Sequence, residues 1–184
     1  EYEGATVNIR ARRAVIFGTG GYANNVELVE RYQQPFAYGA CATTLATGDF
    51  LGIAAEVGAQ LGNMESAWRS TVVFEEAVQN RAVGLGSFVQ PGDSMFVVNR
   101  YGRRIVNEKR NYNDRTRIHQ VFDPNTGQFP NLLSFYIYDR RTAEAFAGNF
   151  PLPRPGTQAR HVITGATLAE LSERIAERLA QYAS

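Results

Sequence analysis

A glycine-rich turn at 18–23 is the first segment of the chain whose residues are suited to binding a ligand. Its sequence, Gly-Thr-Gly-Gly-Tyr-Ala, fits the pattern G-x-G-x-x-A and follows a short apolar run at 14–17. In dinucleotide-binding folds such glycines permit a tight turn and let a pyrophosphate approach the amides at the start of the next helix. The acidic residue expected at the end of a second strand is not evident, so an ordinary strand-to-helix turn without a ligand is the alternative.

A second glycine turn, at 47–49, directly precedes a segment rich in alanine and glycine. Two glycine-centred helix starts suit a long anionic cofactor better than a simple phosphate. The residues expected at such a cofactor site are Thr19, Gly20, Gly21, Thr47, Gly48 and Asp49. Alternatively, Asp49 only caps its helix, and this role is compatible with the same site.

The elements that must position these turns follow from the hydrophobic pattern. We expect strands at 7–10, 14–17, 70–74, 94–99, 105–106 and 135–138, and helices at 24–32, 50–61, 140–146 and 168–182. Thr167 and Glu170 form a capping box before the last helix.

Residues 1–64 supply too few elements to bury both faces of a parallel-type strand. We therefore expect this segment to be incomplete. Its exposed apolar surface should cause self-association or disorder.

The composition excludes several classes of partner. The 184 residues include 19 Lys+Arg and 18 Asp+Glu, and this net charge of +1 argues against nucleic acid or an anionic membrane surface. No apolar run approaches the roughly 20 residues that span a bilayer. Cys41 has no second cysteine to pair with, which favours a reducing, cytoplasmic location. His119 and His161 lack neighbouring ligands, so no metal site is expected.

Three segments, in this order, resemble the fumarate reductase/succinate dehydrogenase-type FAD flavoproteins. Residues 13–22 are similar to the family's kaVilAtGGf segment, residues 47–59 to tGDGi.lA...Ga, and residues 101–108 to GkRFvNE. Phe50 replaces a usual glycine, and Gly18 a usual alanine. The resemblance implies FAD as the cofactor, and an FAD-binding domain interrupted by a smaller capping domain.

On this resemblance, residues 1–64 are the end of the first FAD-binding segment and residues 65–184 are most of the capping, substrate-binding domain. The fold class is then α+β, with a partial α/β FAD-binding segment followed by an α+β cap. The main dinucleotide fingerprint would precede residue 1, and another FAD-domain segment would follow residue 184. That missing remainder of the FAD domain would be a partner of this chain, which by itself would bind FAD weakly or not at all.

Within the family, residues 63–68 resemble the nM.eaWW.P stretch of the 3-ketosteroid dehydrogenase-like branch, and residues 107–114 resemble its NE..pY.d stretch. Arg69 and Ser70 depart from the first of these patterns. Fumarate reductases instead carry a Q.HPT pattern, and no histidine lies near that point in this chain. They also place an arginine acid where Ala143 stands.

The resemblance also implies roles for individual residues. Removal of hydrogen next to a carbonyl requires a hydride acceptor, a base and groups that polarise the carbonyl. Tyr112 would be the base, with Arg104 and neighbouring arginines lowering its pKa. Glu108 would hold an arginine or relay the proton. Trp68 would line the substrate pocket or pack between domains. The alternatives are a surface turn around Tyr112 and a solvated face of arginines.

We therefore expect part of an FAD-dependent dehydrogenase or reductase that acts on a carbon–carbon bond next to the carbonyl of a small ketone and is inactive as an isolated fragment. A fumarate reductase/succinate dehydrogenase-type flavoprotein fragment is the first alternative. A non-catalytic cap module and a stand-alone nucleotide-binding protein that uses residues 18–23 are the others.

Overall fold

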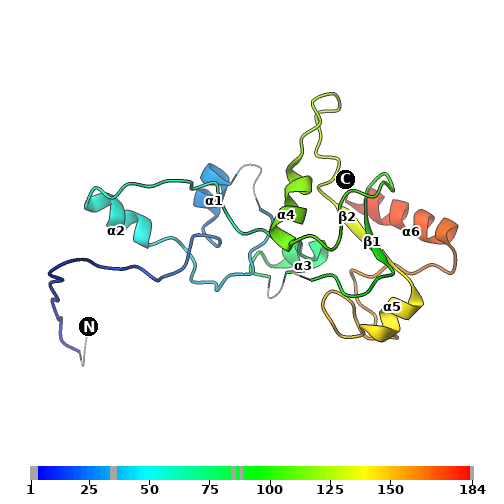
Figure 1. Ribbon diagram of the computed structural model, residues 1–184, viewed down its shortest axis with the longest axis horizontal. Coiled ribbons are helices and arrows are strands. Elements are labelled where there is room, and N and C mark those ends of the chain that lie inside the picture. The colour runs from blue at the N-terminus through cyan, green and yellow to red at the C-terminus, as the bar shows by residue number, and fades with distance from the viewer. Residues whose placement is uncertain (1–3, 34–36, 84–85, 88, 183–184) are drawn as a thin grey trace.

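The computed structural model describes residues 4–33, 37–83, 86–87 and 89–182. In chain order the elements are α1 (Val26–Tyr32), α2 (Phe50–Glu56), α3 (Phe74–Gln79), β1 (Met95–Asn99), α4 (Tyr112–Thr116), the 3-10 helix η1 (Arg117–Gln120), β2 (Ser134–Tyr138), α5 (Arg140–Ala145) and α6 (Leu168–Gln181). The molecule is elongated: α1 and α2 lie in an open N-terminal part, and the other elements gather in a denser part (Figure 1). This combination is consistent with the α+β class.

A two-stranded antiparallel sheet lies in the denser part. Strands β1 and β2 pair from Met95↔Tyr138 to Asn99↔Ser134. The side chains of Val97 and Val98 are buried, and they contribute to the hydrophobic core. The strands predicted at 94–99 and 135–138 are therefore confirmed. They form because both segments carry enough apolar residues to cover one face of a sheet.

The strand predicted at 105–106 as the partner of β1 is wrong. This segment contributes one isolated bridge, Val98↔Arg104, and a hydrogen bond from the Ile105 N–H to the Val97 carbonyl at 3.3 Å. β2 takes the place of the partner because it offers five residues in register. Two apolar residues followed by a turn are too short to compete with that pairing.

The C-terminal helix α6 is confirmed, together with its capping box. Thr167 Oγ1 accepts from the Glu170 N–H at 3.2 Å, and the Glu170 carboxylate accepts from the Ala166 N–H at 2.8 Å. The box therefore closes one residue earlier than the usual reciprocal bond to the cap residue itself. An ion pair of 2.6 Å between Arg178 and Glu75 fastens α6 to α3. The predicted helix at 140–146 is also confirmed as α5.

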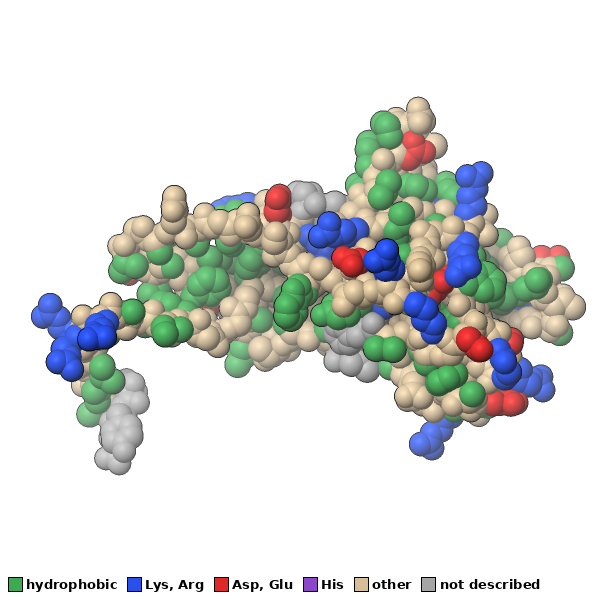
Figure 2. Space-filling model, in the orientation of Figure 1, with side chains coloured by type: hydrophobic (Ala, Val, Ile, Leu, Met, Phe, Trp, Pro, Cys, Tyr) green, Lys and Arg blue, Asp and Glu red, His purple; other side chains and the backbone are tan. Residues whose placement is uncertain are grey.

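The strands predicted at 7–10 and 14–17 are wrong, since the structure has no strand there. Ile9 and Ile16 are 89% and 92% exposed. A strand requires a neighbour that satisfies its backbone N–H and carbonyl groups, and the described residues provide none for these two segments. Figure 2 shows hydrophobic side chains lying open along this extended part. The expectation of exposed apolar surface in residues 1–64 is thus confirmed.

Two other boundaries differ from the prediction. The helix expected at 50–61 ends at Glu56, shortly before Gly58, whose φ of +70° is typical of a helix end. The strand expected at 70–74 is reduced to a single bridge between Thr71 and Ser87, because Phe74 already begins α3. Within the described part of the chain, no helix is long and apolar enough to cross a membrane.

Candidate active site

The structure brings the two predicted glycine turns together. Gly48 is buried, and a Cβ built on it would lie 2.8 Å from both Tyr22 Cβ and Leu28 Cδ1. Its φ of +79° also favours glycine. Because Tyr22 directly follows Gly21, the residue after the first turn packs on the backbone of the second. Two segments that are well separated along the chain thus form one local surface.

Two asparagines at the start of α1 hold this arrangement in place. Asn24 Nδ2 donates to the Thr43 carbonyl at 2.7 Å, and Asn25 Nδ2 donates to the Thr47 carbonyl at 3.0 Å. Asn25 Oδ1 also caps α1 by accepting from the Leu28 N–H at 3.1 Å. The sequence interpretation missed both asparagines. Asparagine at the start of a predicted helix was the available signal.

The first turn presents bare backbone. Thr19, Gly20 and Gly21 are exposed, and Gly20 has a φ of +83°. No other group lies within 4 Å of a Cβ built on Gly20 or Gly21. The turn therefore leaves room for a ligand to approach its amides, which fits an anionic cofactor.

The second turn carries two polar side chains that interact with each other. Thr47 Oγ1 donates to Asp49 Oδ1 at 2.7 Å. Asp49 occupies the position before α2 but makes no capping hydrogen bond with its side chain. The interpretation of Asp49 as a side-chain cap is therefore wrong. Its exposed carboxylate suits a hydroxyl donor of a ligand better than a phosphate, which it would repel.

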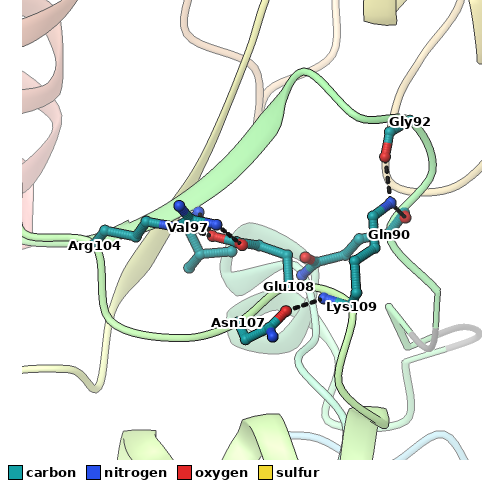
Figure 3. Close-up of polar contacts among 7 residues, drawn as sticks. All are labelled: Gln90, Gly92, Val97, Arg104, Asn107, Glu108 and Lys109. Atoms are coloured by element: carbon teal, nitrogen blue, oxygen red, sulfur yellow. Dashed lines mark hydrogen bonds and ion pairs between the residues drawn. The ribbon is translucent and has the colours of Figure 1, made fainter.

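Glu108 is a buried carboxylate, 5% exposed, at the centre of Figure 3. Its Oε1 accepts from the Val97 N–H at 2.9 Å and from Arg104 Nε at 3.0 Å, and its Oε2 accepts from Arg104 Nη2 at 2.5 Å. Burial raises the pKa of Glu108, but the hydrogen bonds from Arg104 and Val97 together lower it below its usual value. An ionised carboxylate with these partners is suited to holding Arg104. The role of Glu108 as a proton relay stays a prediction.

Lys109 extends in the opposite direction from Glu108 (Figure 3). Its Nζ donates to the Gln90 carbonyl at 3.3 Å and to the Gly92 carbonyl, and its backbone N–H donates to Asn107 Oδ1 at 3.0 Å. The two consecutive side chains therefore fix this segment on both sides, just before α4. The sequence interpretation gave Lys109 no role, although it is the only lysine in the chain.

Tyr112 is half-buried and begins α4. Asn111 caps the helix by accepting from the Asn113 N–H at 2.9 Å. The alternative of a surface turn at this point is therefore wrong. The structure joins Arg104 to Glu108, and Tyr112 follows them on the next element.

The arginines around α4 are mostly exposed, as the alternative of a solvated face predicts. The exposed ones are Arg103, Arg104, Arg110 and Arg117. Arg115 is the exception, because it is buried and its Nη2 donates to the Ser87 carbonyl at 3.4 Å. Trp68 is 87% exposed, so both of its expected roles, lining a substrate pocket and packing between domains, stay predictions.

With this geometry established, comparison with known proteins identifies the family. The family described as FAD binding domain matches residues 2–137, well over half of the chain. The chain belongs to this FAD-binding family. FAD is the family's cofactor, and the glycine turns at 18–21 and 47–49 lie within the matched range.

Several curated relatives are similar to this chain over most of its length. The 4-oxocyclohexanecarboxylate 2-dehydrogenase of Sinomonas cyclohexanicum is 31% identical over 175 residues, which cover 91% of this chain and 29% of that protein. The 3-oxosteroid 1-dehydrogenase of Mycolicibacterium smegmatis is 30% identical over 190 residues, which cover 96% of this chain and 32% of that protein. The 3-oxosteroid 1-dehydrogenase of Mycobacterium tuberculosis is 30% identical over a match that covers 89% of this chain and 30% of that protein. The chain thus spans about a third of these relatives. The resemblance to the 3-ketosteroid dehydrogenase-like branch is confirmed.

Proposed function

We propose that this chain is part of an FAD-dependent dehydrogenase that removes hydrogen from a carbon–carbon bond next to the carbonyl of a cyclic ketone. The observation that carries the proposal is the similarity, over about nine-tenths of the chain, to dehydrogenases named for an oxocyclohexane acid and for 3-oxosteroids. Both names describe a ring ketone. The absence of a histidine near residues 63–68 further disfavours fumarate as the substrate.

The two glycine turns would hold the cofactor. Thr19, Gly20 and Gly21 are exposed, and a Cβ built on Gly20 or Gly21 meets no other group within 4 Å. A pyrophosphate or a ring edge could therefore approach this backbone. Asp49 would accept a hydrogen bond from a cofactor hydroxyl, while Thr47 orients its carboxylate. When bound, FAD would serve as the hydride acceptor.

Tyr112 would take the proton from the carbon next to the carbonyl. An ordinary phenol has a pKa near 10, so a base of this type needs positive charge nearby. Arg104 brings positive charge to the segment before α4, but Glu108 neutralises part of it. Glu108 would therefore act by holding Arg104 and β1 in place. The exposed ring of Trp68 would provide a flat surface for the substrate.

The division into residues 1–64 and 65–184 is part of the proposal, as is the need for further FAD-domain segments. Coverage of about a third of the relatives supports both. We expect the isolated chain to bind FAD weakly and to be inactive. A cytoplasmic location, expected from the single cysteine, belongs to the same proposal.

The test starts from the longest protein that carries this chain, purified and examined for visible flavin absorbance. It is then assayed with 4-oxocyclohexanecarboxylate, a 3-oxosteroid and fumarate, using an artificial electron acceptor or donor. Turnover of a ring ketone is expected, and exclusive turnover of fumarate or the lack of flavin would contradict the proposal. Tyr112→Phe should lower kcat by about 10²- to 10⁴-fold. Tyr101→Phe, at an exposed turn, is the matched control.

A further inference from the structure

A series of hydrogen bonds starts beside the first glycine turn and leads away from it. The Tyr22 hydroxyl donates to the Met64 carbonyl and accepts from Gln33 Nε2 at 2.7 Å. Gln33 Nε2 also donates to the Met64 carbonyl at 2.7 Å. Gln33 is buried, so its amide is directed inward at the end of α1. Tyr22 and Gln33 therefore form one fixed unit behind the turn at 18–21.

Arg69 continues this series toward the denser part of the molecule. Its Nη2 donates to Gln33 Oε1 at 2.6 Å. Burial lowers the pKa of Arg69, whereas the nearby Tyr22 raises it, and the guanidinium keeps its charge. A charged donor on a buried amide oxygen is stronger than a neutral hydrogen bond. We call this contact the Gln33–Arg69 link.

The backbone of Arg69 in turn holds α4 from two sides. The Arg69 N–H donates to Asn113 Oδ1 at 3.0 Å, and the Arg69 carbonyl accepts from Thr116 Oγ1 at 3.1 Å. Asn113 and Thr116 lie on α4, and Asn113 directly follows Tyr112. Continuous hydrogen bonds thus connect the residue after the first glycine turn to the residue after the candidate base.

Little apolar packing supports the elements on the glycine-turn side. Val29 is the buried residue of α1, and α2 has none. Where few apolar side chains are buried, polar contacts carry a larger share of the restraint on position. Gln33 and Arg69 lie 36 positions apart in the sequence, so local backbone geometry does not hold them together.

We propose that Gln33 and Arg69 are positioning residues that fix α4, and with it Tyr112, relative to the glycine turn at 18–21. The roles of Tyr112 and of the turn rest on the proposed function, whereas the mechanical connection is a property of the chain itself. Arg69 is one of the two positions, with Ser70, at which the chain departs from the pattern of its branch at residues 63–70. An arginine there supplies a link that an aromatic ring would not form with Gln33.

Such a link matters for chemistry because proton and hydride transfer depend on close distances. A misplacement of about 1 Å can lower the rate about 100-fold. Neither Gln33 nor Arg69 needs to touch the substrate for this effect.

Hydrogen exchange of backbone amides tests the connection on the chain without any flavin. The variants are Gln33→Leu, which keeps the size but removes the amide, and Arg69→Met, which removes the guanidinium. The reporters are the amides of Asp114 and Arg115, which donate to the Asn111 carbonyl at 3.1 and 3.0 Å. We expect both variants to lower the protection of these amides by about 2- to 10-fold.

Controls separate a specific link from general loosening. Arg141→Met removes an exposed ion pair with Asp93 and should leave the α4 amides unchanged. Arg69→Lys keeps the positive charge and a donor group, so it should retain more protection than Arg69→Met. The comparison of these two Arg69 variants keeps the test decisive if Gln33→Leu fails to fold. Unchanged protection of α4 in a folded Arg69→Met chain would overturn the inference.

Kinetics of the longest protein that carries this chain, purified with its flavin, provide the second readout. The link predicts a fall in kcat for Arg69→Met with little change in KM, since substrate binding is not its role. Altered exchange with an unchanged kcat would overturn the positioning role. A protein without flavin would contradict the proposed function, whereas the exchange results would still decide whether the link fixes α4.

Discussion

Glu108 and Arg104 form an ion pair that is buried at one end and open at the other. The Glu108 side chain is 4% exposed, that of Arg104 is 63% exposed, and Nη2 and Oε2 lie 2.5 Å apart. Glu108 also accepts from the Val97 N–H in β1, at 2.9 Å. The carboxylate therefore joins the sheet to the segment that leads into α4. Its removal would leave a buried backbone N–H without an acceptor, which is more costly than the loss of a surface ion pair.

Glu108→Ala should therefore lower the free energy of unfolding by about 1–3 kcal/mol, because the N–H of Val97 loses its buried acceptor. Urea unfolding followed by circular dichroism measures this change. Asp93→Ala is the control, since Asp93 is 84% exposed in its pair with Arg141 and should change stability by no more than about 0.5 kcal/mol. Equal effects of the two substitutions would show that the burial of Glu108 contributes nothing.

A second prediction concerns pH. Burial lowers the pKa of His119 below its usual 6.5, and the positive charge of Arg115 lowers it further, whereas a hydrogen bond with the Asn131 carbonyl partly opposes this shift. Since the folded pKa lies below the unfolded one, the unfolded chain takes up the proton first as the pH falls. Stability should thus be full above pH 6.5 and decline below it, until the folded pKa is passed.

His119→Gln tests this dependence, because glutamine can still donate to a carbonyl but does not titrate. The variant should show a flatter change of unfolding free energy between about pH 7.5 and pH 5.5 than the original chain. His161→Gln replaces the other histidine and serves as the control. If the dependence of unfolding free energy on pH is lost only in the His161 variant, His161 causes it and the prediction for His119 is contradicted.

Much of the denser part could be predicted because its signals are local. The capping box of Thr167 and Glu170, the apolar runs of β1 and β2, and the N-cap Asp139 before α5 each lie within a few residues of the element they specify. The family could be inferred from the sequence for a related reason, since three short segments in a fixed order carry the resemblance.

Other features could not be predicted because they depend on distant partners. An apolar run such as 14–17 is a strand only if another strand pairs with it, and its own sequence does not specify one. The burial of Glu108 depends on where β1 lies, and the Gln33–Arg69 link joins residues 36 positions apart. The meeting of the two glycine turns was expected from their composition, but the asparagines that hold them were not.

The close packing at Gly48 gives a third prediction. Gly48→Ala would force an L-residue to a φ of +79° and place its Cβ 2.8 Å from Tyr22 and Leu28. The left-handed conformation and the overpacking together should cost roughly 2–4 kcal/mol, measured by thermal or urea unfolding.

Two alanine substitutions separate the causes of that loss. Gly58→Ala has a similar φ of +70° but meets no atom within 4 Å, so it should cost only about 1–2 kcal/mol. Gly21→Ala meets no neighbour and has no positive φ, so it should leave stability unchanged while weakening FAD binding if the turn contacts the cofactor. A destabilised Gly21→Ala chain would show that the turn is packed rather than open.

The exposed apolar residues of the N-terminal segment give the last prediction. Ile9, Val15 and Ile16 are exposed on an extended segment whose backbone is not paired within the described residues. Apolar surface of this kind, next to open backbone groups, favours association with a second copy. The chain should therefore sediment as a mixture of monomer and larger species, and the proportion of larger species should rise with concentration.

The variant Ile16→Lys tests which segment drives this association. It should shift the mixture toward monomer without lowering the unfolding temperature, because the side chain of Ile16 makes no core contacts. Val78→Lys, at an exposed site on α3 outside this segment, is the control. A chain that stays monomeric at all concentrations would show that this segment does not drive association.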